Sequence, residues 1–237
     1  MQVNQQKPEP FEKSDGSHLD LHSIFHTLQG EGPFAGMPSI FVRLAGCNLQ
    51  CPFCDTEYTH GREVVRTSVI FERITELRKR WPNTRLIVLT GGEPTRQVID
   101  QLVIGLTRQG LSVQLESNGV LTPSSDVIRL VRGGEAAWIV SPKTAHIHEN
   151  CVYATAFKYV LSADDLDTDG LPIHALGHKA KPRIARPPLT FRGEIYVNPM
   201  DAQDLIVNQA NLAACRESAL HHGYRMGIQL HKYLQLP

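Results

Sequence analysis

Short apolar runs alternate with longer segments of helical periodicity along most of the chain. The runs, bounded by Gly, Pro or polar residues, predict strands. The predicted strands cover residues 22–28, 39–44, 86–89, 111–116, 138–140, 157–161, 194–197 and 226–230. Segments with apolar residues at every third or fourth position predict helices over 68–81, 96–109, 124–132 and 202–222. Strands that alternate with helices favour an α/β fold with a wound or barrel sheet of parallel strands.

Two segments depart from this alternation. Residues 1–20 are polar, with almost no β-branched or aromatic residues, and we expect a flexible leader there. Residues 163–192 are acidic first and basic afterwards, with four prolines, which favours a solvated insertion loop over an interaction surface. The remaining chain, residues 21–237, has the length of a single domain.

The composition narrows the choice of partners. Apolar residues make up 41% of the chain, and 24 basic side chains balance 24 acidic ones. No large field of one sign results, so we expect no direct nucleic-acid partner. The N-terminus lacks the apolar core of a signal peptide, and no apolar run approaches membrane-spanning length. The sequence therefore predicts a cytoplasmic protein with no membrane partner.

Three of the five cysteines fall within eight residues. Cys47, Cys51 and Cys54 have the spacing C-x3-C-x2-C, and three thiolates can bind three corners of an iron–sulfur cubane while the fourth iron stays open. The alternative is structural zinc, for which His60 would complete a Cys3His set. Cys151 is isolated, as is Cys215, and both are expected to be small buried hydrophobes.

A glycine pair follows the predicted strand over 86–89. The segment reads Leu-Thr-Gly-Gly-Glu-Pro over residues 89–94. Glycines have no Cβ atom, so a ligand can approach the backbone closely at Gly91 and Gly92. An ordinary turn between a strand and a helix also uses such a pair. The cysteine loop earlier in the chain favours the interpretation in which the glycines approach a ligand.

The cysteine spacing, the aromatic Phe53 before the last cysteine and the Gly-Gly-Glu-Pro turn together resemble the radical S-adenosylmethionine (SAM) superfamily. The resemblance implies an incomplete TIM-like barrel of parallel strands and a 4Fe-4S cluster on Cys47, Cys51 and Cys54. It further implies that the open iron chelates SAM, which is split to a 5′-deoxyadenosyl radical. By the same resemblance, the cofactor contacts are Phe53, Asp55, Gly92, Glu93, Ser117, Ser141, Pro142, Lys143, Asn198, Pro199, Met200 and Asp201.

A narrower resemblance rests on Thr-Leu-Gln-Gly-Glu-Gly at 27–32, Phe-Val-Arg-Leu at 41–44 and Cys-Asp-Thr at 54–56. These segments are similar to the 7-carboxy-7-deazaguanine synthase family. The resemblance implies ring contraction of 6-carboxy-5,6,7,8-tetrahydropterin to 7-carboxy-7-deazaguanine with loss of ammonia, and Mg²⁺ held at Thr56. The implied substrate contacts are Leu28, Gln29, Gly30, Glu31, Arg43, Thr90, His231 and Pro237.

Arg43 has a planar guanidinium that suits the substrate carboxylate, and a surface ion pair is its alternative role, as a core position is for His231. Two other functions stay open: an activating enzyme that places a radical on a glycine of another protein, and a zinc-stabilised binding module without catalysis. The family also implies a homodimer and an electron donor such as a flavodoxin.

Overall fold

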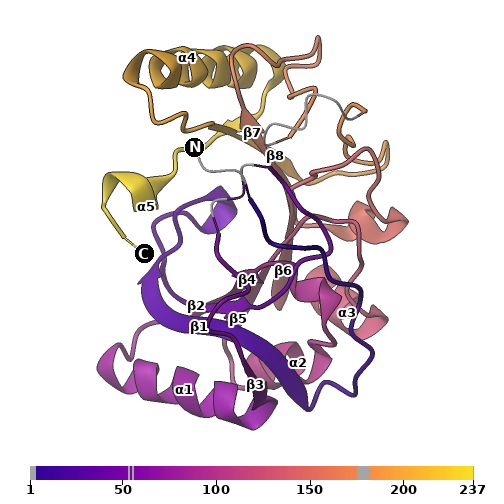
Figure 1. Ribbon diagram of the computed structural model, residues 1–237, viewed down its shortest axis with the longest axis vertical. Helices are drawn as coiled ribbons and strands as arrows, with labels where there is room; N and C mark the ends of the chain where they lie inside the picture. Colours follow the sequence, from indigo (N-terminus) through magenta and orange to yellow (C-terminus); the bar gives the residue numbers. More distant parts are fainter. Residues whose placement is uncertain (1–3, 53, 55, 176–181, 237) are drawn as a thin grey trace.

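The computed structural model describes residues 4–52, 54, 56–175 and 182–236. Its described residues form one nine-stranded sheet in the order β3-β1-β2-β4-β5-β6-β7-β8-β9. The pairs from β2–β4 to β8–β9 are parallel, whereas β1 pairs antiparallel with both β2 and β3. Figure 1 shows the sheet curving around an interior space without closing. The predicted incomplete barrel of mainly parallel strands is therefore confirmed.

Most elements match the predicted ones within a few residues. The strands are β1 His18–Leu28, β2 Pro38–Leu44, β3 Glu63–Arg66, β4 Leu86–Gly91, β5 Ser112–Ser117, β6 Ala136–Val140, β7 Ala156–Leu161, β8 Glu194–Pro199 and β9 Arg225–Met226. The helices are α1 Thr67–Arg80, α2 Asp100–Arg108, α3 Ser125–Arg132, α4 Leu205–His222 and α5 Leu230–Tyr233. Single 3-10 turns are η1 Gly32–Phe34, η2 Pro94–Arg96 and η3 Glu149–Tyr153.

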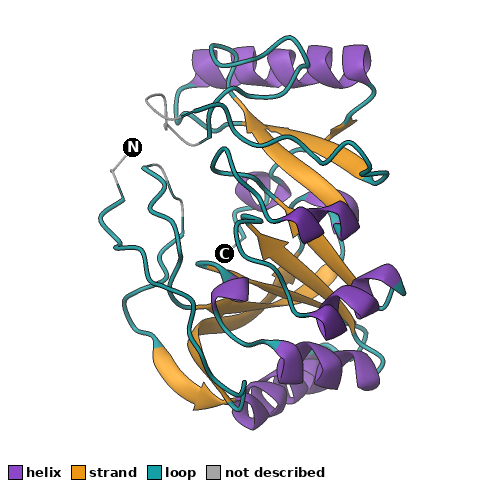
Figure 2. Cartoon of the chain, turned by 90° about the vertical axis from the view of Figure 1, so that its right-hand side faces the viewer, coloured by secondary structure: helices purple, strands orange, loops and turns teal. Residues whose placement is uncertain are grey.

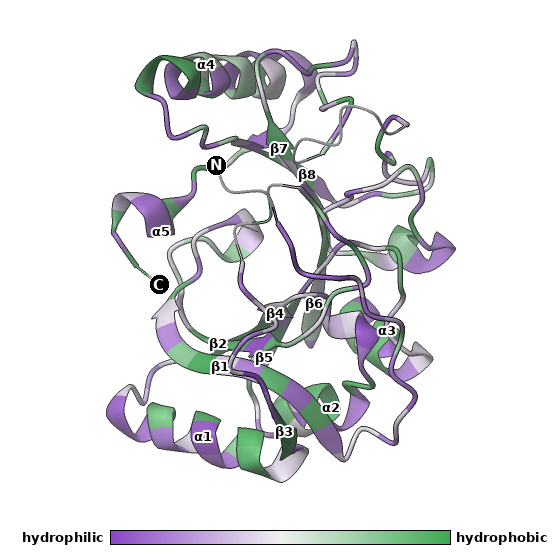
Figure 3. Cartoon of the chain, viewed as in Figure 1, coloured by the Kyte–Doolittle hydropathy of each residue, from purple (hydrophilic) through white to green (hydrophobic). Residues whose placement is uncertain are grey.

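Helices α1, α2 and α3 cover the outer face of the sheet. Figure 2 shows them on one side of the strands, with α4 set apart at one end of the molecule. In α1, Ile70 and Ile74 are buried, and in α2 Leu102 and Leu106 are fully buried against the strands. Figure 3 shows α1 with bands of both polarities and β6 mainly hydrophobic, as expected for a surface helix on a central strand. No helix in the described part of the chain has the length and apolar character needed to span a membrane.

The structure departs from the predicted elements at three places. The first two strands form an antiparallel hairpin, in which Leu28 pairs with Pro38, because the short connection of residues 29–37 carries no crossover helix. The predicted strand 226–230 is confined to β9, and Leu230 already opens α5. The predicted helix 96–109 begins only at Asp100, after η2.

The two segments set apart by composition both lie against the body of the protein. β1 begins at His18, inside the predicted leader, and residues 4–16 form neither helix nor strand. The long loop between β7 and β8 carries internal ion pairs. In it, Arg186 contacts Asp169 through Nε at 2.7 Å, and Arg183 contacts the same carboxylate at 2.7 Å. Opposite charges of this loop thus pair with each other.

Candidate active site

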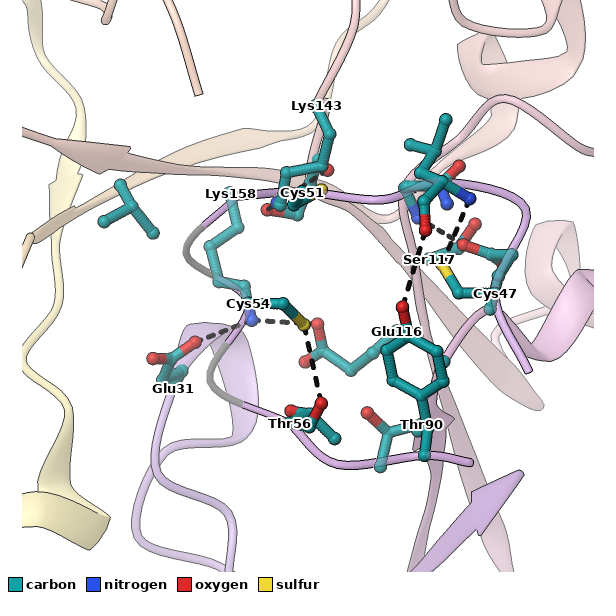
Figure 4. Close-up of a pocket in the computed structure, with 18 of the residues that line it drawn as sticks. Glu31, Cys47, Cys51, Cys54, Thr56, Thr90, Glu116, Ser117, Lys143 and Lys158 are labelled. Atoms are coloured by element: carbon teal, nitrogen blue, oxygen red, sulfur yellow. Dashed lines mark hydrogen bonds and ion pairs between the residues drawn. The ribbon is translucent and has the colours of Figure 1, made fainter. Parts of the chain in front are cut away.

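The predicted cluster loop follows β2, and its described residues form no helix or strand before β3 begins at Glu63. Cys47 and Cys51 are buried and Cys54 is half-buried. All three line one cavity of about 210 Å³, to which the carboxyl ends of β4, β5 and β6 contribute. Figure 4 shows the three cysteines around this cavity, with Lys143 and Ser117 beside them. The first cavity is therefore bounded by thiols at the edge where parallel strands present their ligand sites.

The zinc alternative lacks its fourth ligand, because His60 lies away from the cysteines. Among the described residues, no three His, Cys, Asp or Glu side chains converge on one metal position. Thiolates on a cubane each bind a different iron and need no such convergence. His60, the fourth ligand of the zinc alternative, is exposed and contacts Glu57 at 3.1 Å. It does not line the cavity.

Burial sets the protonation of these thiols. It raises the pKa of Cys47 to about 12 and also raises the pKa of Cys51, on which the charge of Lys143 acts in the opposite direction. Thiolates in this cavity thus need a strong cationic partner, and iron ions supply one. The donor set fits a 4Fe-4S cluster.

The glycine pair joins the cluster loop to β4. The Gly92 amide donates to Leu44 at 3.0 Å, and the Glu93 amide donates to Gly46 at 2.9 Å. A Cβ on Gly92 would lie 1.9 Å from the Gly46 oxygen, so only glycine permits this approach. From the sequence, the missing Cβ atoms were expected to make room for a ligand. The structure shows that the cluster loop itself packs where a Cβ on Gly92 would lie.

Glu93 has structural partners as well as a place in the first cavity. Its carboxylate accepts hydrogen bonds from the Thr95 hydroxyl at 2.6 Å and from the backbone amide of Asn118 at 2.7 Å. These bonds join the ends of β4 and β5. Burial raises the pKa of Glu93, an effect that these hydrogen bonds oppose. Glu93 therefore fixes the wall of the cavity.

The other predicted cofactor contacts separate into two groups. Ser117, Ser141 and Lys143 line the first cavity, and the Lys143 ammonium donates to the Ser141 hydroxyl at 2.6 Å. Pro142 does not line it. The stretch from Asn198 to Asp201 also lies outside this cavity, although Asn198 is fully buried at the end of β8. Phe53 and Asp55 lie outside the described residues.

A second cavity, of about 340 Å³, brings together the predicted substrate contacts. Those that line it are Leu28, Gln29, Gly30, Glu31, Arg43, Thr90 and His231. Pro237 lies outside the described residues. Thr56, the predicted Mg²⁺ position, lines both cavities. The Arg43 guanidinium lies over the Phe25 ring, 4.9 Å from its centroid, which restricts its orientation.

Lys158 and Glu116 belong to the site although the sequence reasoning assigned neither of them. The Lys158 ammonium contacts Glu31 at 2.7 Å and Glu116 at 2.9 Å, and all three line both cavities. Their side chains are only 11–14% exposed. Figure 4 shows Lys158 between the two carboxylates. The available signal was a lysine inside the apolar run of residues 156–161.

The ion pairs fix the charges at this boundary. Burial acts to raise the pKa of Glu31, but the Lys158 charge and hydrogen bonds from Lys158 and Gln229 lower it to about 2. Burial acts to lower the pKa of Lys158, and the two carboxylates outweigh it and raise that pKa. Glu31 is therefore an anion that accepts hydrogen bonds at neutral pH, not a proton donor.

Comparison with known proteins agrees with this geometry. The Radical SAM superfamily profile matches residues 42–146, which include the cysteine loop, the glycine turn and β5. The fold and site thus define a radical SAM enzyme. A 7-carboxy-7-deazaguanine synthase from Rhodospirillum rubrum is 39% identical over 97% of this chain and 96% of its own length. A 7-carboxy-7-deazaguanine synthase from Hyperthermus butylicus is 34% identical over 92% of this chain and 94% of its own length.

The chain belongs to the 7-carboxy-7-deazaguanine synthase family and is a radical SAM lyase. The crystal structure of QueE from Escherichia coli has the same fold, with a TM-score of 0.63. That likeness covers 90% of this chain and 95% of the other at 22% identity.

Proposed function

We propose that this protein converts 6-carboxy-5,6,7,8-tetrahydropterin to 7-carboxy-7-deazaguanine with release of ammonia. The observation that carries the proposal is the shared wall of the two cavities, formed by Glu31, Thr56, Thr90, Glu116 and Lys158. A substrate in the second cavity would lie directly beside a radical source in the first. When bound, the cluster and SAM supply the radical that removes one substrate hydrogen.

The residues of the first cavity would hold the cofactors. Cys47, Cys51 and Cys54 would ligate the 4Fe-4S cluster, and the backbone after β4 would receive the amino group of SAM. Ser117, Ser141 and Lys143 supply hydroxyls and an ammonium for its ribose and carboxylate. The remaining proposed cofactor contacts are Phe53, Asp55, Gly92, Glu93, Pro142, Asn198, Pro199, Met200 and Asp201.

The second cavity would orient the pterin. Arg43 would bind the substrate carboxylate through its planar fork. The Glu31 carboxylate accepts hydrogen bonds, as the amino-bearing edge of a pterin requires, and Thr56 would hold Mg²⁺ against the substrate carboxylate. Leu28, Gln29, Gly30, Thr90, His231 and Pro237 complete the proposed substrate contacts.

The decisive experiment is anaerobic incubation of the reconstituted protein with SAM, a one-electron reductant, Mg²⁺ and the carboxylated tetrahydropterin. We expect the deazaguanine by mass spectrometry, together with one ammonia per product. Replacing Cys47, Cys51 and Cys54 with Ala should abolish both product and bound iron. SAM cleavage without this product would refute the substrate assignment and leave the superfamily assignment intact.

We also propose a homodimer. On α4, Leu205, Ile206 and Leu220 are each at least 75% exposed. They fall within about 100° of one another around the helix axis, so they lie on the same side of the helix. Figure 3 shows the hydrophobic bands on this helix. Sedimentation of wild type and Leu220→Glu tests the proposal, since a monomeric wild type would refute it.

Two expectations remain, the electron donor and the location in the cell. We propose a flavodoxin or a similar small redox protein as the electron donor, because the cluster must receive one electron at a time. The cytoplasmic location expected from the sequence also stays a proposal.

A further inference from the structure

The N-terminal strap, residues 4–12, runs alongside the cluster loop (Figure 2). The Asn4 amide donates to the Pro52 oxygen at 2.8 Å, and the Asn4 side chain donates to the Cys51 oxygen at 3.1 Å. Farther along, the Glu9 amide donates to the Cys47 oxygen at 2.7 Å. The strap therefore binds the backbone of two of the three cysteines.

Gln6 reaches the segment after the third cysteine. Its side-chain amide nitrogen donates to the backbone oxygen of Thr56 at 2.9 Å. Its amide oxygen accepts from the Tyr58 amide at 2.8 Å and from the Thr59 hydroxyl at 3.3 Å. Because the described residues of the cluster loop form no helix or strand, their backbone groups need partners from elsewhere, and the strap supplies several of them.

Buried charge anchors the strap to the core. The Arg96 side chain is only 4% exposed, and its guanidinium lies 3.5 Å from Glu9 and 3.6 Å from Glu12. The same guanidinium donates to the Ala45 oxygen at 3.1 Å, at the start of the cluster loop. On the outside, Arg62 contacts Glu9 at 2.6 Å. Arg96 thus ties the strap to the start of the cluster loop.

We propose that the N-terminal strap holds the cysteine loop in its ligating conformation and slows loss of the cluster, with Asn4 and Gln6 as positioning residues. This role rests on the proposed function, because it requires a cluster on the cysteines. None of the described residues 4–12 lines either cavity. The strap therefore touches neither cavity directly and acts through the backbone of the cluster loop.

The test compares wild type, the double variant Asn4→Ala/Gln6→Ala and the control Lys7→Ala, whose side chain is exposed. Each protein is reconstituted anaerobically, assayed for iron and sulfide, and mixed with an iron chelator. Losing a few hydrogen bonds should accelerate iron release about tenfold. The control should match wild type, and circular dichroism should show the same fold in all three.

A deletion of residues 1–8 provides a second variant that keeps Glu9 and Glu12 on Arg96. We expect it to release iron at least as fast as the double variant. Iron-loaded variants that release iron at the wild-type rate would overturn the strap role alone. A wild type that holds no iron would overturn the proposed function as well.

Discussion

Replacing Lys158 with Met tests how much the positive charge between the two cavities contributes to the stability of the fold. Methionine keeps most of the side chain's length but removes the ammonium that lies 2.7 Å from Glu31 and 2.9 Å from Glu116. The two carboxylates then share a largely buried site without a cation. Glu31 keeps its hydrogen bond from Gln229 at 2.7 Å, so its position is partly preserved.

The expected cost follows from the pKa of Glu31. A pKa lowered from 4.5 to about 2 corresponds to about 3 kcal/mol of stabilisation of the anion. This agrees with the cost of about 3–5 kcal/mol for removing one partner of a buried ion pair. For a chain of this length we expect the melting temperature to fall by roughly 6–12 °C at pH 7.

The pH dependence has a definite sign. Because the pKa of Glu31 is lowered in the folded state, its contribution is complete above about pH 4.5 and is lost as the pH falls toward 2. The raised pKa of Lys158 leaves the ammonium charged throughout this range. The difference between wild type and Lys158→Met should therefore be largest near neutral pH and shrink below about pH 4.5.

Anaerobic thermal unfolding at pH 7 and pH 4, followed by circular dichroism, measures both effects. The triple variant Lys158→Met/Glu31→Gln/Glu116→Gln is the matched control, because it removes the charges together. We expect it to recover most of the stability but not the activity, since the substrate loses its anionic partners. Equal melting of Lys158→Met and wild type at pH 7 would refute the reasoning.

Three further substitutions test other parts of the structure. Gly92→Ala places a Cβ 1.9 Å from the Gly46 oxygen and should abolish iron binding, whereas Gly133→Ala should retain normal iron content. Arg43→Lys loses the planar fork, so KM for the pterin should rise about tenfold or more with little change in kcat; an unchanged KM contradicts the carboxylate contact. Arg186→Ala breaks the ion pairs of the long loop and should speed proteolysis there, destabilising the fold by about 1 kcal/mol without changing activity.

The fold was predictable where strands and helices alternate, and the prediction failed where they do not. β1 reads His-Leu-Asp-Leu at its start, an alternation typical of an antiparallel strand with one solvated face. These residues pair with β3, but residues 18–20 were assigned to the leader, and the later alternation of strands and helices favoured parallel pairing. β3 has four residues and β9 two, too few for a periodic signal.

The site residues also differ in whether their neighbours in the sequence are enough to identify them. The cysteine loop and the glycine turn are contiguous motifs, so the amino-acid sequence alone is enough to assign their residues. Lys158 has partners 127 and 42 positions away, and only the order of strands brings them together. A lysine in an apolar strand is visible in the sequence, whereas its counterions are not.

The position of Lys158 in the sheet explains why a buried charge lies there. In the sheet order, β2, β4, β5 and β6 separate β1 from β7, so the segment after β1 and strand β7 face each other across an interior that no hydrogen-bonded strand closes. Phe34, in η1 after β1, packs on Ala137, Ile139 and Ala156 and fills one part of that gap. The ion pair of Lys158 with Glu31 spans it at the level of the two cavities. An ion pair that joins the two sides of an open barrel must influence both stability and cavity shape, which is why Lys158→Met should affect melting and pterin binding together.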